Sequence, residues 1–147
     1  MNLQNPRLLR CGALLAINLL FLMVWGFAGL GKLQSGMPTW FPDKFGATLL
    51  GRFPGLTASF WSLALVEVLA FALALAALLR GEFLERRSVW LLPWMLVVSL
   101  FLFVQLSFGQ WLTDEFGGTS MLFSYFTGTL VALMFVMTGS SSPNSPK

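Results

Sequence analysis

The chain has 147 residues, of which 56% are hydrophobic and only 10% charged, and its formal net charge is +3. Soluble domains carry about 25% charged residues, so this composition, with a mean hydropathy of +0.77, indicates a protein whose solvent is lipid. One cysteine (Cys11) and no histidine exclude an internal disulfide, a Ser-His-Asp triad, and a His/Cys metal or haem site built from this chain alone.

Four apolar runs are each long enough to cross a bilayer, whose hydrocarbon core of ~30 Å needs about 20 helical residues. They cover residues 9–30, 57–79, 89–109 and 120–138. In lipid, a single segment satisfies its own backbone hydrogen bonds only as a helix. We therefore predict an all-α integral membrane bundle of four transmembrane helices, in one domain over residues 1–139.

Two parts of this prediction concern the ends of the chain. The apolar part of the first run exceeds the ~7–15 residues of a signal-peptide core, so we expect that run to be retained as a helix. The Ser/Pro-rich residues 140–147 have no apolar side chain to bury, and we predict a disordered tail.

The connection after the first run is long and aromatic. Residues 42–53 could form a short helix, with Phe41, Phe45 and Leu49 at i, i+4 and i+8 on one face. Such a helix would lie in the membrane interface with Trp40 at headgroup level. The alternative is a loop packed over the bundle.

The second run contains one acidic residue, Glu67. The residues that share its side of a helix are small, which is typical of faces where membrane helices approach each other closely. They are Ala64, Ala70, Ala74 and Ala77. We therefore predict that Glu67 points into the bundle. Gly26 and Gly29 in the first run are further candidates for close packing, as is a stripe in the fourth run made of Ser124, Gly128 and Ala132.

Depth along the helices gives Glu67 its candidate partners. At 1.5 Å per residue, it lies about 9 Å below an interface at Trp61, or about 15 Å below one at Thr57. Lys32 ends the first run on the same side, and an ion pair with Glu67 is plausible for the shallower placement. Other polar residues of the later runs fall in the same half of the membrane, namely Gln105, Ser124 and Tyr125. Together these five residues predict a polar, ligand-binding pocket that opens toward the outer leaflet.

Sidedness follows from the basic residues of the short loops. One set is expected to be cytoplasmic and comprises Arg7, Arg10, Arg80, Arg86, Arg87 and Lys147. The opposite side has Lys32, Lys44 and Arg52. The larger number of basic residues in the first set predicts that both termini are cytoplasmic.

The pattern resembles the DoxX/DoxD-like group of small four-helix bacterial membrane proteins. A glycine followed by a lysine at the end of the first helix and a glutamate in the second are recurring marks of that group. Gly26 or Gly29, Lys32 and Glu67 match them, and Glu115 matches an acidic residue that is common before the fourth helix. The resemblance implies a place in the bacterial inner membrane and an association with membrane redox or thiol-stress complexes.

Three functional hypotheses remain open. The first is an accessory subunit without catalytic activity that anchors or stabilises a larger, respiratory or redox, membrane complex, with protein partners and a structural Lys32–Glu67 pair. The second is a subunit of a membrane oxidoreductase that engages a quinone or quinol, with Glu67 as the candidate proton acceptor. A flavin- or metal-bearing partner would then be required, because we expect the chain to bind no metal or other cofactor by itself. The third is a small transporter, which the chain supports less well because it shows no inverted repeat.

Overall fold

The computed structural model describes residues 5–85 and 87–138, and all regular secondary structure in these residues is helical. Four helical segments are long and apolar enough to cross a membrane. This confirms the predicted all-α, four-span membrane bundle. The tail predicted at 140–147 lies outside the described residues, as do Arg86 and Lys147.

The first span is one continuous helical segment from Pro6 to Ser35, made of α1 (Pro6–Trp25), the π-helical η1 (Gly26–Leu30) and α2 (Gly31–Ser35). It is longer than the predicted 9–30, because Asn5 caps its start by accepting from the Arg7 N–H and the helix continues past the glycines. The other spans lie within a few residues of their predicted ranges and are α5 (Leu56–Leu79), α6 (Leu91–Trp111) and α7 (Phe116–Thr138).

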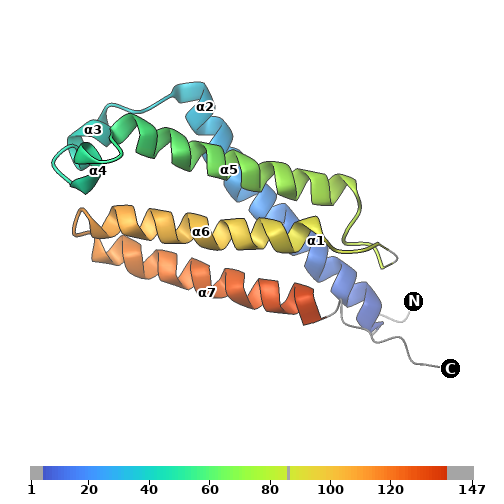
Figure 1. Ribbon diagram of the computed structural model, residues 1–147. Helices are drawn as coiled ribbons and strands as arrows, with labels where there is room; N and C mark the ends of the chain where they lie inside the picture. The colour runs from blue at the N-terminus through green and yellow to red at the C-terminus, as the bar shows by residue number, and fades with distance from the viewer. Residues whose placement is uncertain (1–4, 86, 139–147) are drawn as a thin grey trace.

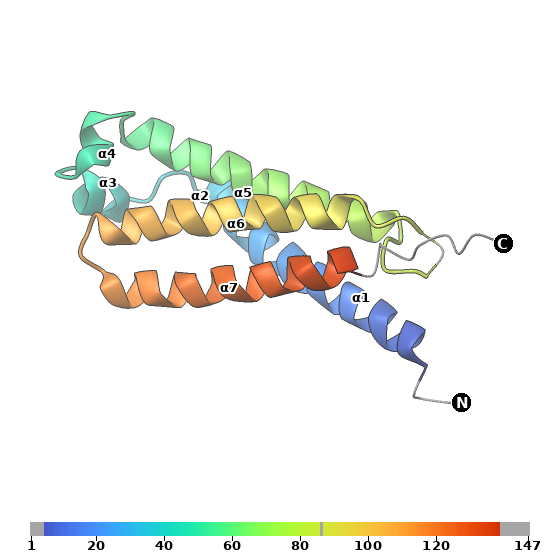
Figure 2. The same ribbon diagram turned by 60° about the horizontal axis from the view of Figure 1, so that its bottom comes forward.

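Figure 1 shows α5, α6 and α7 lying side by side, with α1 crossing obliquely. Each span packs mainly on the next one in sequence: α1 on α5, α5 on α6 and α6 on α7. The start of α1, the α5–α6 connection and the end of α7 lie together, and we call this the arginine end (Figure 2). The opposite, loop end has α3 (Trp40–Phe45), α4 (Leu49–Arg52) and the α6–α7 turn.

The segment at the loop end packs on the bundle through aromatic rings. Phe41 and Phe45 are buried, and the Phe41 ring lies 4.8 Å from that of Phe45 and 5.4 Å from that of Phe60 on α5, measured between centroids. Leu49, in contrast, is exposed. The segment forms two short helices because Thr48 caps a new one through the Leu50 N–H, which breaks the expected i+8 register. This arrangement favours the packed loop over a helix with its apolar face in lipid.

Hydrogen bonds join the first span to its neighbours within the bundle. The indole N–H of Trp25 donates to Ser99 Oγ of α6 at 2.8 Å, and both side chains are buried. Asn18 is also buried, and its amide orientation is assigned from its hydrogen-bonding partners. In that orientation its nitrogen donates to the Ala74 carbonyl at 2.9 Å and its oxygen accepts from the Leu78 N–H at 3.2 Å. In lipid, such bonds and close packing replace the hydrophobic effect as the forces between helices.

The closest approach of the first span to α5 occurs at two glycines. A Cβ on Gly26 would lie 3.0 Å from two ring atoms of Phe71, and one on Gly29 would lie 3.0 Å from both the backbone nitrogen and Cγ2 of Val68. Glycine therefore allows η1 to lie directly against α5, as the sequence predicted for Gly26 and Gly29. The π-helical geometry of η1, typical of functional or strained helix segments, coincides with this contact.

Replacing Gly29 with alanine should destabilise the bundle. The new methyl would press on the Val68 backbone, which cannot move aside, and overpacking of this kind costs about 1–3 kcal/mol. Gly31→Ala is the matched control, because a Cβ at Gly31 would meet no atom within 4 Å in the part of the chain that the structure describes. Unfolding in detergent should occur at a lower temperature for Gly29→Ala than for Gly31→Ala, and equal values would contradict this account of the contact.

Candidate functional site

The contact between η1 and α5 brings Lys32 and Glu67 together as a two-point ion pair. The Lys32 ammonium lies 2.9 Å from Oε1 and 2.8 Å from Oε2 of the carboxylate. Glu67 is buried, with 2% of its side chain exposed, whereas 26% of the Lys32 side chain is exposed. Glu67 therefore points into the bundle, as predicted, and Lys32 approaches it from the accessible side.

The helical geometry explains why this pair forms. Side chains of an α-helix lean toward its N-terminus, so Lys32 leans back over the preceding turn, which contains Gly29. Gly29 lies against the backbone of Glu67 and Val68. The alanines that share the Glu67 face are fully buried and keep the neighbouring helices close. An intramembrane carboxylate is costly, and here the ammonium neutralises both of its oxygens.

The other three predicted pocket residues lie elsewhere. Gln105 is half-buried on α6 and donates to Ser62 Oγ at 3.5 Å. Ser124 is exposed on α7 and donates to the Ser120 carbonyl of its own helix at 3.3 Å. Tyr125 is 51% exposed, and its ring centroid lies 6.0 Å from that of Phe103. Among the described residues, none of these three contacts the Lys32–Glu67 pair through a hydrogen bond or ring contact.

The small-residue stripe on α7 does not pack inside the chain as the corresponding stripe on α5 does. Ser124 and Gly128 are exposed, and a Cβ on Gly128 would meet no atom of the described residues within 4 Å. Ala132 packs partly against the core. Only Thr129 and Val136 of α7 are buried, so most of this helix faces outward.

Glu82 is a buried carboxylate that sequence reasoning missed. Its side chain accepts hydrogen bonds from the backbone N–H groups of Trp90, Leu91 and Leu92 at 2.9–3.1 Å, at the start of α6. Negative charge is favourable at that position because the first N–H groups of a helix are unsatisfied and carry a partial positive charge. In the sequence Glu82 looks like a loop charge, since the cap forms only when the chain reverses between α5 and α6.

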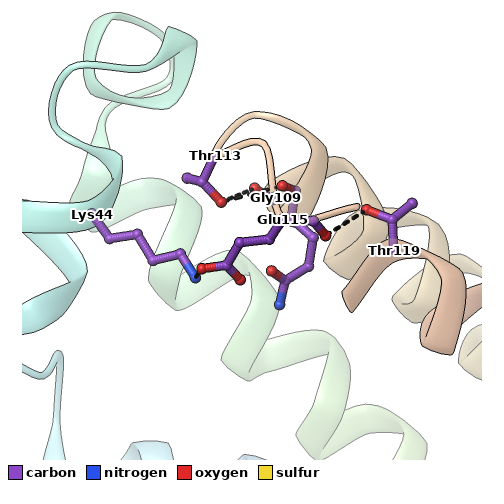
Figure 3. A network of polar contacts seen from close by, with 6 residues as sticks. Lys44, Gly109, Thr113, Glu115 and Thr119 are labelled. Carbon is purple, nitrogen blue, oxygen red and sulfur yellow. Dashed lines mark hydrogen bonds and ion pairs between the residues drawn. The ribbon is translucent and has the colours of Figure 1, made fainter. Parts of the chain in front are cut away.

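A second ion pair fixes the loop end (Figure 3). Lys44 of α3 lies 2.7 Å from the carboxylate of Glu115, in the turn between α6 and α7. The Glu115 backbone is held in turn by Thr119, whose hydroxyl donates to the Glu115 carbonyl at 3.3 Å. Both ion-pair partners are partly exposed, so this contact positions α3 rather than forming a buried site.

Comparisons with protein-family models, curated proteins and solved structures find no match to this chain. The resemblance to the DoxX/DoxD-like group therefore stays a hypothesis that rests on the glycines, Lys32 and Glu67.

Replacing Lys32 should lower the stability of the chain more than replacing Glu67. Lys32→Met leaves a buried carboxylate without its counter-charge and should cost about 3 kcal/mol of unfolding free energy. Glu67→Gln should cost less, because the partly exposed Lys32 can turn toward solvent or headgroups. The double variant should be more stable than the sum of the single effects predicts. Unfolding of all four proteins in one detergent measures this coupling, and additive effects would show that the pair contributes nothing.

Proposed function

We propose that this chain is a DoxX-like accessory subunit that anchors or stabilises a larger membrane complex, and that the outward face of α7 contacts the partner protein. The redox or respiratory character of that complex follows from the resemblance alone. The observation that carries the proposal is the position of Tyr125.

Tyr125 is the tenth residue of α7 and lies about 14 Å along a helix that rises 1.5 Å per residue, which is close to the middle of a ~30 Å hydrocarbon core. Half of this side chain is exposed, and its hydroxyl hydrogen-bonds to none of the described residues. Tyrosine prefers the membrane interfaces, and a phenol hydroxyl in hydrocarbon without an acceptor is costly. An acceptor on a neighbouring protein helix would remove that cost.

The surroundings of Tyr125 suit such a helix. Gly128 lies about one turn further along the exposed side and offers open space for close approach. The hydroxyls of Ser124 and Thr127 donate to carbonyls of α7 itself. These two small side chains can therefore face a neighbouring helix without leaving an unsatisfied hydrogen-bond donor. This combination of small residues with one unsatisfied polar group is typical of helix interfaces in membranes.

The contacts of the Glu67 carboxylate support a structural role for the ion pair. Glu67 is the only acidic residue within the four candidate spans, and both of its oxygens contact Lys32. The proposal places the protein in the bacterial inner membrane with both termini cytoplasmic. Its support is the gathering of Arg7, Arg10 and Arg87 at one end, as the preference for positive charge on the cytoplasmic side requires.

A bulky residue on the α7 face should release the partner without unfolding the chain. Gly128→Leu adds volume where no described atom lies within 4 Å of the new Cβ, so it should leave the unfolding temperature unchanged but reduce co-purification of a stoichiometric partner from native membranes in mild detergent. Ala72→Leu is the matched control, since Ala72 is exposed on α5. A chain that purifies alone, or a partner retained equally by both variants, would contradict the proposal.

The Lys32 ammonium favours a second candidate, the subunit that engages a quinone or quinol. Two of its three donors contact Glu67, and its partial exposure leaves the third able to reach a quinone carbonyl. On oxidation of a bound quinol to the quinone, Glu67 would accept one of the two protons, water would accept the other, and a partner with a flavin or metal would take the two electrons.

Glu67→Gln distinguishes the two roles when it is introduced into the intact complex. The accessory role predicts fewer assembled complexes, each with unchanged quinone-dependent turnover. The quinol role predicts normal assembly and a loss of turnover per complex of about 10²-fold or more, because proton transfer by a positioned side chain contributes about 10²–10⁴-fold.

A further inference from the structure

A cavity of about 690 Å³ opens at the arginine end, between the start of α1 and the α5–α6 connection. Figure 2 shows these elements beside the end of α7. The lining divides into a charged part and an apolar part. The charged and polar residues are Arg7, Arg10, Glu85, Arg87 and Ser88, and the apolar ones include Cys11, Leu14, Phe83 and Val89.

Positive charge predominates among the described residues that line this cavity, which include three guanidinium groups and one carboxylate. Arg7 lies 2.9 Å from Glu85, but the two side chains are 73% and 53% exposed, and exposed pairs of this kind contribute about 0–1 kcal/mol. An incoming anion can therefore share Arg7 at little cost. Glu82 does not line this cavity: its oxygens accept hydrogen bonds at the start of α6, and Oε1 lies 3.9 Å from Nε of Arg80.

Two contacts with α7 hold the side chain of Arg10 in position. Its Nη2 donates to the Val136 carbonyl at 3.3 Å, and its guanidinium carbon lies 5.7 Å from the centroid of the Phe135 ring. Both contacts orient the planar group, and one hydrogen bond uses only one of its five N–H donors. The remaining donors form the fork that binds phosphate in a two-point fashion.

The apolar part of the cavity distinguishes lipid from a water-soluble anion. Leu14 is buried on the first span, and Phe83 and Val89 pack against the core. The cavity thus has basic groups next to an apolar wall at the end of the membrane spans, where phospholipid phosphates lie. Basic pockets between transmembrane helices bind anionic lipid headgroups in this way.

We propose that this cavity binds the phosphate of an anionic phospholipid, with Arg10 as the fixed anchor, Arg87 and Arg7 completing the charge, and the glycerol and first acyl carbons against Leu14, Phe83 and Val89. The net positive lining selects lipids with a net negative headgroup over zwitterionic ones. Nothing in this assignment depends on the partner of α7 or on the Lys32–Glu67 pair, which lies toward the opposite end.

The test compares the purified chain in phosphatidylcholine nanodiscs with and without phosphatidylglycerol, and measures bound lipid by native mass spectrometry and the unfolding temperature. Phosphatidylglycerol should be retained and should raise the unfolding temperature. The Arg10→Gln/Arg87→Gln variant should bind it about 25-fold more weakly, since each basic residue near the surface contributes about a factor of five. Arg52→Gln, an exposed arginine at the loop end, should bind it as the wild type does.

Three outcomes would overturn the proposal: equal retention of phosphatidylcholine and phosphatidylglycerol, equal loss of binding in Arg52→Gln, or a stabilisation by glycerol 3-phosphate alone that matches the effect of the lipid. The last would identify a site for a soluble anion. If the double variant fails to fold, Arg87→Gln serves in its place, because this exposed loop side chain should leave folding intact and weaken phosphatidylglycerol binding about fivefold.

Discussion

The close contact between η1 and α5 is the constraint on which the bundle depends. Lipid provides no hydrophobic driving force for helix association, so close packing and polar bonds must hold the helices together. At this contact both occur together, because Gly29 allows the backbones to meet and Lys32 then reaches the buried Glu67. Each depends on the other: the buried carboxylate would be costly without the ammonium, and the ammonium could not reach it across a wider gap.

Polar bonds are distributed unevenly over the four spans. The first span is joined to α5 by Asn18 and Lys32 and to α6 by Trp25, while Glu82 ties the α5–α6 connection to the start of α6. The fourth span contacts mainly α6, largely through apolar side chains. Hydrogen bonds thus join the first three spans into one unit, and α7 packs on this unit. Near the end of α7, the Val136 carbonyl accepts a hydrogen bond from Arg10.

Much of this architecture could be predicted from the sequence, since bilayer thickness limits span length and helical periodicity limits which residues share a face. The inward direction of Glu67 followed from its alanine neighbours. The same reasoning failed to separate the stripe of α5 from that of α7, because periodicity indicates a close-packing face without saying whether the neighbour belongs to the same chain. The π-helix at Gly26–Leu30 and the Glu82 cap also escaped prediction, since each depends on contacts between segments distant in sequence.

The two sites proposed to bind ligands from outside the chain both involve α7, one through its exposed face and the other through the contacts of Arg10 with this helix. The guanidinium of Arg10 both lines the cavity at the arginine end and contacts Phe135 and the Val136 carbonyl of α7. A phosphate that binds Arg10 would hold this guanidinium more firmly against α7. It would thereby restrain the end of α7 against α1, and with it the orientation of the face containing Tyr125 and Gly128. Binding that rigidifies one element lowers the entropic cost of a second binding event on it. An anionic lipid in the cavity would accordingly strengthen the contact between α7 and its partner, and a partner on α7 would strengthen the binding of lipid by the same factor.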